Sequence, residues 1–178
     1  GVKWKELGEN GKQWPVAQDG TDSDLLHADS FKRGLGKFVY NSFKETEEIL
    51  QHGKEYPYII TTNRELEHYN CGAMTRRTGN EKILKEDYLM INPEDAAKHL
   101  INEGDMVCVE SARGKVDVRA RITDEVKPGI LSSTFHFPEI MMNNITSDQS
   151  DSEAMCPEYK VVAVNIRKSK GKYKNAAV

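Results

Sequence analysis

The densest group of chemically active side chains lies between Thr61 and Arg77, directly after a short apolar run. This segment supplies hydroxyl, amide, imidazole and guanidinium groups, among them those of Asn63, Arg64 and His68. Backbone N–H groups that follow a strand can bind phosphate oxygens, and an arginine guanidinium group presents several donors in a fixed geometry. The segment could therefore bind a phosphate group or a polar heterocycle. Its simpler explanation is a connecting loop.

Two further segments combine aromatic rings with polar side chains. The first contains Phe135 and His136 and is followed by Asn143, and the second contains Tyr159 and Lys160. Aromatic rings can flank a planar ligand, while imidazole and amide groups make directional hydrogen bonds. Taken singly, His136 is better explained as a core histidine and Asn143 as a turn residue.

The common local signatures of catalysis and metal binding do not occur in the sequence. It has no Gly-x-Ser-x-Gly motif, no Walker loop and no Gly-x-Gly-x-x-Gly fingerprint. The cysteines Cys71, Cys108 and Cys156 form no Cys-x-x-Cys pair and have no zinc-site spacing. We predict no catalytic residue and no metal ligand in this chain, and we expect free thiols in a reducing, cytoplasmic compartment.

Length and charge restrict the class of protein further. A chain of 178 residues suits one domain of ordinary size and can fold without a metal, disulfide or cofactor. Its formal net charge of -3 gives no overall basic surface, which argues against a nucleic-acid partner. No apolar run approaches the roughly 18 residues that a membrane-spanning helix needs, so we expect no membrane span.

The elements that must position these side chains are mainly strands. Runs rich in β-branched and aromatic residues, separated by turn formers, predict strands at 58–62, 88–91, 106–111, 115–122, 130–137 and 159–166. Apolar side chains alternate from Val116 to Ile122, so the charged residues between them, Asp117 included, should face water. A closed or nearly closed β-barrel best protects the edges of such a sheet.

Two short helices and one hairpin accompany the predicted strands. Asn92 is a suitable N-cap and Pro93 a suitable first helical residue for a helix that runs to about Ile101. The capping-box pattern Ser42-Phe43-Lys44-Glu45 predicts a helix that ends near Gly53. Gly114 should supply the positive φ of a tight hairpin between two strands.

Composition divides the chain into three parts. Residues 1–55 are rich in turn formers, so we expect an N-terminal arm that continues from a preceding domain absent from this chain. Residues 56–168 contain the strands and should form the β-barrel domain. Residues 169–178 contain several lysines and no acid, which predicts a basic, disordered tail.

Several short blocks occur in a specific order along the sequence. They are Tyr56-Pro57 with Thr61-Thr62-Asn63-Arg64, Glu67-His68-Tyr69 with Met74-Thr75-Arg76-Arg77, Ile91-Asn92-Pro93-Glu94-Asp95-Ala96, Phe135-His136-Phe137 with Asn143-x-Ile145-Thr146, and Pro157-Glu158-Tyr159-Lys160. In this order they resemble the C-terminal, molybdopterin-dinucleotide-binding domain of formate dehydrogenase α subunits, within the dimethyl sulfoxide reductase family. The arm is similar to the segment that leads into this domain, at Trp14-Pro15 and Gly36-Lys37-Phe38.

The resemblance implies a six-stranded double-psi β-barrel, mainly β, with short flanking helices. It also implies binding of molybdopterin guanine dinucleotide, which carries molybdenum or tungsten in the full oxidoreductase. In that family the metal ligand and the iron–sulfur site belong to upstream domains of the same parent enzyme, which would be the partners of this chain. We therefore expect the isolated chain to position the cofactor and not to oxidise formate by itself.

The resemblance assigns cofactor-binding roles to residues in each of the polar segments. They are Thr62, Asn63, Arg64, Glu65, His68, Asn70, Thr75, Phe135, His136, Asn143, Tyr159 and Lys160. The family usually has Gly where this chain has Asn63, and Asn is the next most suitable residue at positive φ. The turn can therefore be kept, with altered amide contacts.

Two alternatives to a formate dehydrogenase module stay open at this point. A similar barrel occurs in nitrate reductases and in formylmethanofuran dehydrogenase, as a domain or a separate subunit. A double-psi barrel can also be a protein-binding adaptor without a cofactor. An adaptor has no reason to keep Arg64, His68, Asn143 and Lys160 together, so their positions in the fold distinguish it from a cofactor-binding domain.

Overall fold

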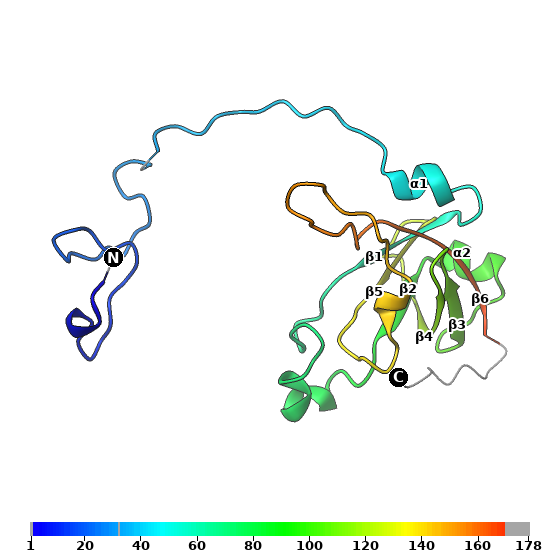
Figure 1. Cartoon of the computed structure of the whole chain (residues 1–178). Coiled ribbons are helices and arrows are strands. Elements are labelled where there is room, and N and C mark those ends of the chain that lie inside the picture. Colours follow the sequence, from blue (N-terminus) through cyan, green and yellow to red (C-terminus); the bar gives the residue numbers. More distant parts are fainter. Residues whose placement is uncertain (1, 32, 170–178) are drawn as a thin grey trace. The chain divides into compact units, whose positions relative to one another are not determined.

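The computed structural model describes residues 2–31 and 33–169, which form two units (Figure 1). The first unit is Gly1–Phe43 and the second is Lys44–Val178. Residues 170–178 of the predicted tail lie outside the described residues. The first unit contains one short 3-10 helix, Trp4–Glu6, among turns and extended segments.

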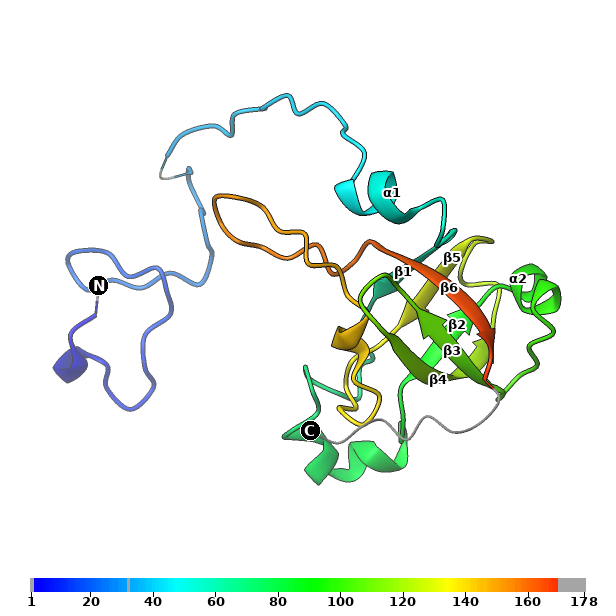
Figure 2. The same ribbon diagram turned by 45° about the vertical axis from the view of Figure 1, so that its right-hand side comes forward.

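The second unit is a closed barrel with the strand order β1-β5-β2-β4-β3-β6 (Figures 1 and 2). The strands are β1 Tyr58–Thr62, β2 Tyr88–Ile91, β3 Met106–Glu110, β4 Lys115–Ile122, β5 Ile130–Ser133 and β6 Val162–Lys168. Two α-helices, α1 Glu47–His52 and α2 Pro93–Lys98, and the 3-10 helices Thr75–Arg77, Gly79–Lys82 and Met142–Asn144 complete the unit. The predicted fold class, a mainly β closed barrel with few helices, is confirmed.

Two interlocking connections define the topology of the barrel. β1 pairs in parallel with β5, β2 pairs in parallel with β4, and β2 and β5 are antiparallel neighbours. The connection from β1 to β2 therefore passes β5, and the connection from β4 to β5 passes β2. These two crossovers give the double-psi arrangement that the resemblance implied.

This topology brings the polar segments to one end of the barrel. Thr62, the last residue of β1, pairs with Ser133, the last residue of β5, so the chain leaves both strands side by side. β6 is antiparallel to β1 and its first residue, Val162, pairs with Ile60. The segments after β1, after β5 and before β6 therefore meet where β1 and β5 end.

The barrel interior is filled by aliphatic side chains that alternate along the strands. Val116, Val118 and Ala120 of β4 are buried, as the pattern predicts, and Ile122 packs partly buried against the same core. Asp117 differs from the prediction, because it is only 8% exposed. Its Oδ1 atom has no hydrogen-bond partner among the described residues.

The hairpin between β3 and β4 needs a glycine for space. The Gly114 carbonyl accepts a hydrogen bond from the Ser111 N–H group at 2.9 Å. A Cβ atom at Gly114 would lie 2.9 Å from the carbonyl oxygen of Asn144. Gly114 is not among the glycines with positive φ, so the predicted reason for this glycine is wrong.

Several element ends differ from the predicted ones. α2 begins as predicted, with the Asn92 side chain accepting a hydrogen bond from Glu94 N–H at 3.0 Å, but it ends at Lys98. Leu100 has a φ of 54°, which a continuing helix cannot accommodate.

Among the described residues, no helix has the length and apolar character that crossing a membrane requires.

Helix α1 is capped by Thr46, whose hydroxyl accepts a hydrogen bond from Ile49 N–H at 3.2 Å. Glu48 in this helix is fully buried. Its carboxylate accepts hydrogen bonds from two guanidinium nitrogens of Arg113, at 2.7 and 2.9 Å, and from the backbone N–H of Ala163 at 2.9 Å. The helix therefore packs on β6, and the second unit begins before residue 55, where the sequence placed the end of the arm.

The buried carboxylate of Glu48 leads to a pH-dependent prediction. Burial raises the pKa of Glu48, but the hydrogen bonds and charge of Arg113 and the Ala163 N–H group outweigh burial and hold the pKa below its ordinary value of 4.5. A lowered folded-state pKa stabilises the folded protein above the unfolded-state pKa, and this stabilisation is lost as the pH falls through the folded-state pKa. We expect the Glu48→Gln variant to lose stability less steeply than the wild type between about pH 5 and about pH 3.

Urea unfolding of the chain at a series of pH values measures this slope. The exposed neighbour Glu47 supplies the control, and the Glu47→Gln variant should keep the slope of the wild type. Equal slopes for wild type and Glu48→Gln would contradict the assigned role of this carboxylate.

Candidate functional site

The turn after β1 is held by backbone and side-chain contacts. Asn63 donates its N–H to the carbonyl of Ser133 at 3.0 Å, which extends the β1–β5 pairing by one hydrogen bond. The exposed Arg64 donates from Nη2 to Oδ1 of Asn70 at 2.9 Å, and its guanidinium group lies 5.6 Å from the centre of the Tyr69 ring. Asn70 has a φ of 49°, a conformation that Asn tolerates.

His136 connects two points of this turn from inside the protein. Its side chain is fully buried, and Nε2 accepts a hydrogen bond from the Glu65 N–H at 3.0 Å. Nδ1 lies 2.5 Å from the carbonyl oxygen of Asn70, which can only accept. His136 is therefore a neutral imidazole with its proton on Nδ1. Both of its nitrogens are occupied, so it positions the turn between Glu65 and Asn70.

His68 has the opposite arrangement of its ring proton. Its Nε2 lies 2.9 Å from the carbonyl oxygen of Leu84 and must donate, and in the neutral ring Nδ1 then accepts from the hydroxyl of Thr75 at 3.0 Å. The Thr75 oxygen in turn accepts from Tyr69 N–H at 3.3 Å. The ring of His68 contacts Phe137 at right angles, with 5.1 Å between the ring centres. His68 therefore fixes the loop after β1 against the segment after β5.

The two tautomers are a direct prediction of this geometry. We expect nitrogen NMR of the ¹⁵N-labelled chain to show a protonated Nδ1 for His136 and a protonated Nε2 for His68 at about pH 7. The variants His68→Gln and His136→Gln assign the two sets of signals. The same tautomer in both rings, or a doubly protonated ring, would contradict the hydrogen-bond directions given above.

Asp87 is a supporting residue that the sequence analysis did not identify. It is fully buried and its carboxylate accepts hydrogen bonds from the hydroxyl of Thr134, from His136 N–H at 3.1 Å and from Phe137 N–H at 3.0 Å. These bonds turn residues 134–137 away from the sheet, so β5 ends at Ser133 and not at the predicted Phe137. The signal in the sequence was an acid directly before an apolar strand, which is common and unspecific.

A second supporting contact reaches Glu65 from β2. The hydroxyl of Tyr88 donates to Oε1 of Glu65 at 2.5 Å, and the guanidinium group of Arg121 lies 4.6 Å from the centre of the Tyr88 ring. Burial, together with the hydrogen bond and the charge of Glu65, raises the pKa of Tyr88 to about 12. The tyrosine therefore stays protonated and holds the Glu65 side chain at neutral pH.

The segment before β6 joins the same cluster. Lys160 donates from Nζ to the carbonyl of Thr62 at 2.6 Å, and its ammonium group lies 5.6 Å from the centre of the Tyr159 ring. The hydroxyl of Thr62 lies 3.5 Å from the carbonyl of Tyr159. This hydrogen bond brings together two residues that are 98 positions apart in the sequence.

The residues that the resemblance assigned to the cofactor differ in exposure. Exposed are Arg64, Asn70, Asn143, Tyr159 and Lys160; partly buried are Asn63, Glu65, Thr75 and Phe135; buried are Thr62, His68 and His136. Each of them except Phe135 and Asn143 takes part in one of the hydrogen bonds described above, and the tilted Phe135 ring lies with its centre 5.6 Å from that of His136. Of the four residues predicted to converge, Arg64, His68 and Lys160 lie on segments that meet at this end of the barrel, whereas Asn143 makes no described contact with them.

Asn143 lies at the same end of the barrel without a described contact to this cluster. Its 3-10 helix packs on β4, and the carbonyl of the next residue, Asn144, adjoins Gly114 at the start of that strand. β2 begins at this end of the barrel, because its second residue, Leu89, pairs with Ser133, the last residue of β5. β4 runs parallel to β2 and begins further out at the same end. A role for Asn143 in binding stays a prediction.

The side-chain oxygen of Asn63 bears on whether a nucleotide-linked pterin fits this cluster. Oδ1 of Asn63 is buried and has no hydrogen-bond partner among the described residues, which is costly unless a ligand supplies a donor. Amino groups on a pterin or guanine ring are such donors, and the cations Arg64 and Lys160 beside it suit phosphate oxygens. The donors and the acceptor of the cluster therefore fit this class of cofactor.

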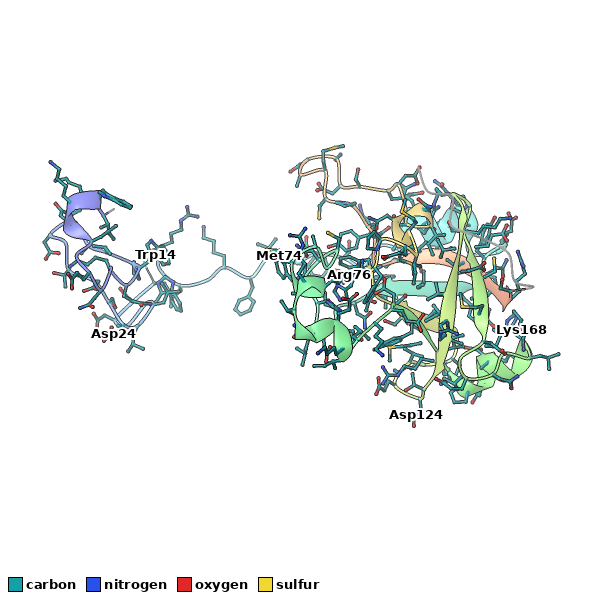
Figure 3. All side chains as sticks on the ribbon, turned by 90° about the horizontal axis from the view of Figure 1, so that it is seen from below. Trp14, Asp24, Met74, Arg76, Asp124 and Lys168 are labelled. Atoms are coloured by element: carbon teal, nitrogen blue, oxygen red, sulfur yellow. The ribbon has the colours of Figure 1, made fainter. Side chains whose placement is uncertain are left out.

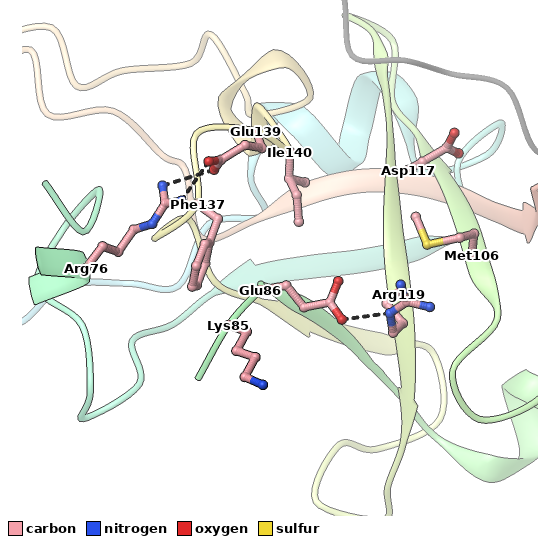
Figure 4. Close-up of a pocket in the computed structure, with 9 residues that line it drawn as sticks. All are labelled: Arg76, Lys85, Glu86, Met106, Asp117, Arg119, Phe137, Glu139 and Ile140. Atoms are coloured by element: carbon pink, nitrogen blue, oxygen red, sulfur yellow. Dashed lines mark hydrogen bonds and ion pairs between the residues drawn. The ribbon is translucent and has the colours of Figure 1, made fainter. Parts of the chain in front are cut away.

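A cavity of about 350 Å³ adjoins the cluster at Phe137 (Figure 4). Arg76, labelled with Met74 in Figure 3, binds Glu139 at its edge through two hydrogen bonds of 2.7 and 3.1 Å and lies 4.8 Å from the centre of the Phe137 ring. Arg119 similarly binds Glu86 at 2.7 Å. None of the residues assigned to the cofactor lines this cavity. The described residues also contain no group of three or more His, Cys, Asp or Glu side chains that could hold a metal ion.

Comparison with known proteins identifies relatives that are much longer than this chain. The F420-dependent formate dehydrogenase subunit alpha of Methanocaldococcus jannaschii is 37% identical over 172 residues, which cover 94% of this chain and 25% of the relative. Formate dehydrogenase H of Escherichia coli is 30% identical over 175 residues, which cover 93% of this chain and 24% of the relative. The periplasmic nitrate reductase of Desulfovibrio desulfuricans is 34% identical over 116 residues, which cover 65% of this chain and 15% of the relative. The chain thus spans about a quarter of the length of the formate dehydrogenases it matches.

The fold has a counterpart among solved structures, and a family model covers the barrel. Acetylene hydratase from Pelobacter acetylenicus superposes with a TM-score of 0.60 at 17% identity, over 74% of this chain and 21% of that one. The family model described as "Molydopterin dinucleotide binding domain" matches residues 58–163, from the first residue of β1 into β6. With the clustered donors at the end of the barrel, this match shows that the chain belongs to the molybdopterin-dinucleotide-binding domain family.

Proposed function

We propose that this chain holds molybdopterin guanine dinucleotide in a molybdenum- or tungsten-dependent formate dehydrogenase. The observation that carries the proposal is the cluster after β1, where the unpartnered Oδ1 of Asn63 lies in the same turn as Arg64. Lys160 meets this turn from the segment before β6. A polyanionic ligand with ring N–H groups complements all three side chains.

Each side chain has a separate task in this proposal. Arg64 and Lys160 bind phosphate oxygens with charge-assisted hydrogen bonds, and Asn63 accepts from an amino group of a ring. His68, His136 and Asp87 are buried and hold the backbone that presents these groups. Phe135, Tyr159 and Asn143 border the cofactor. The bound cofactor supplies the electron chemistry, and this chain supplies its position.

The extent of similarity favours formate dehydrogenase over nitrate reductase. The match to the methanogen formate dehydrogenase subunit leaves only 6% of this chain outside, so it includes most of the arm. The match to the periplasmic nitrate reductase covers 65% of the chain over 116 residues, which is fewer residues than the second unit, Lys44–Val178, contains. The arm therefore supports the first function, and nitrate reduction is the second candidate.

The remaining parts of the catalytic site would come from the rest of the parent polypeptide. We place the metal ligand and an iron–sulfur site there, as the resemblance to formate dehydrogenase α subunits implies. The isolated chain then binds cofactor without oxidising formate. The free cysteines Cys71, Cys108 and Cys156 support a cytoplasmic location for the enzyme.

Purification of the complete polypeptide that contains this sequence tests the proposal. We expect bound molybdenum or tungsten, release of guanosine monophosphate on acid hydrolysis, and formate-dependent dye reduction. Nitrate-dependent dye oxidation without formate activity would replace formate dehydrogenase by nitrate reductase. A folded complete polypeptide with no guanine nucleotide and no metal would contradict the proposed cofactor.

A further inference from the structure

The arm exposes large apolar side chains along a short extended stretch. Phe38, Val39, Tyr40 and Phe43 are between 76% and 106% exposed, and Leu35 is 89% exposed. Trp14, labelled in Figure 3, is 73% exposed elsewhere in the same unit. Single exposed apolar residues are normal on a protein surface, but a continuous run of them marks a surface that another element covers.

The backbone of this stretch has no internal partner. Residues 35–45 take part in no hydrogen bond within the described part of the chain, from either backbone or side chain. They have no helical or strand assignment and are drawn as an extended trace in Figure 1. Phe, Val and Tyr are residues with high strand propensity. The stretch thus has the composition of a strand and unpaired N–H and C=O groups.

The side chains also indicate what kind of sheet would accept it. In an extended segment, Phe38 and Tyr40 point to one face, while Val39 and Phe43 point to the other. Each face therefore carries two large apolar side chains, with Ser42 beside the first pair and Lys37 and Asn41 beside the second. Strands with two apolar faces occur where a sheet is covered on both sides, as in domains with helices packed on each face.

The length of the relatives indicates where a partner for this stretch could lie. About three quarters of the methanogen formate dehydrogenase subunit lies outside the match to this chain, which is enough for further domains. Because the match leaves only 6% of this chain outside, most of the arm has a counterpart in that longer protein. In a polypeptide of that length the remaining residues belong to the same molecule as this stretch, so the partner to which we assign it would be present in every copy.

We propose that residues 37–43 form a strand that pairs with the edge of a β-sheet in the part of the parent polypeptide outside this chain. Strand addition satisfies the unpaired backbone groups and buries apolar side chains on both faces of the sheet. The stretch immediately precedes α1, which Glu48 joins to the barrel. The added strand therefore attaches the cofactor-binding barrel to a neighbouring domain.

Hydrogen exchange at single-amide resolution tests this pairing. The 178-residue chain and the complete polypeptide are compared under the same conditions, with the amides of β1 as an internal control for folding. In the isolated chain we expect fast exchange throughout residues 37–43. In the complete polypeptide, every second amide should exchange at least about 100-fold more slowly, because an edge strand directs alternate N–H groups to its neighbour.

Two proline variants of the complete polypeptide give a matched pair. Val39→Pro and Tyr40→Pro each remove one N–H group at adjacent positions, so only one of them removes a hydrogen bond to the neighbouring strand. We expect one variant to restore fast exchange across the stretch and the other to keep most of the protection. Because the readout is exchange and not cofactor content, the result is independent of the proposed function.

Three outcomes would overturn the proposal. Fast exchange of residues 37–43 in the complete polypeptide would show that the stretch stays unpaired. Slow exchange without alternation, equally sensitive to both proline substitutions, would show burial as a coil. Protection that appears in the isolated chain as its concentration is raised would identify a second copy of this chain as the partner.

Discussion

Replacing Arg64 and Lys160 together by alanine is expected to lower the molybdopterin content of the complete enzyme by about 100-fold or more under limiting cofactor. Hydrogen bonds to charged groups contribute about 1.5–3 kcal/mol each, so the loss of two corresponds to about 3–6 kcal/mol of binding free energy. Both cations lie beside the turn after β1, where Lys160 contacts the carbonyl of Thr62. The guanosine monophosphate released on acid hydrolysis, per mole of protein, measures the effect.

The control removes the same charge elsewhere on the barrel unit. Lys54 and Lys127 are exposed, so the Lys54→Ala and Lys127→Ala double variant changes the net charge equally and should keep its cofactor. Urea unfolding of the isolated Arg64→Ala and Lys160→Ala chain should show a folded domain. Full cofactor occupancy in the complete enzyme that carries Arg64→Ala and Lys160→Ala would refute the assignment of both residues.

Replacing Asp87 by alanine is expected to lower the free energy of unfolding by about 3–5 kcal/mol, since each buried donor left without a partner costs about 1–3 kcal/mol. The carboxylate accepts from the Thr134 hydroxyl and from the N–H groups of His136 and Phe137. These residues carry the imidazole that holds Glu65. We therefore expect the variant to lose cofactor as well as stability.

The exposed Asp124, in the turn between β4 and β5, provides the matched control for Asp87. Urea unfolding of the Asp124→Ala chain should differ from wild type by less than about 0.5 kcal/mol. The Asp87→Asn variant distinguishes the effect of losing the side-chain volume from the effect of losing the carboxylate. It keeps the volume, but it removes the charge and replaces one acceptor by a donor. A stable Asp87→Ala chain with wild-type cofactor content would show that this carboxylate does not support the site.

Much of the barrel could be predicted because its local signals are strong. The bounds of β1, β2 and β4 agree with the predicted runs, since each is apolar or alternating and ends at turn residues. β5 was predicted four residues too long, because residues 134–137 have strand propensity but give their N–H groups to Asp87. Local propensity contains no information on a partner almost 50 residues away.

The site shows the same division between local and long-range information. Residue types and their order indicated which segments converge, and the contact of Lys160 with Thr62 bears this out. They did not indicate that His68 and His136 are buried with both ring nitrogens occupied. Nor did they indicate that Glu48 is buried against Arg113, because that pair depends on how α1 packs against the barrel.

The structure of the complete enzyme with its cofactor tests the central claim most directly. We expect phosphate oxygens within hydrogen-bond distance of Arg64 and Lys160, and a ring amino group within that distance of Oδ1 of Asn63. The opposite end of the barrel, where β2 and β4 end, is formed by the start of α2 and by residues 123–129. A cofactor bound at that end, or one that leaves the Asn63 oxygen without a donor, would contradict the account.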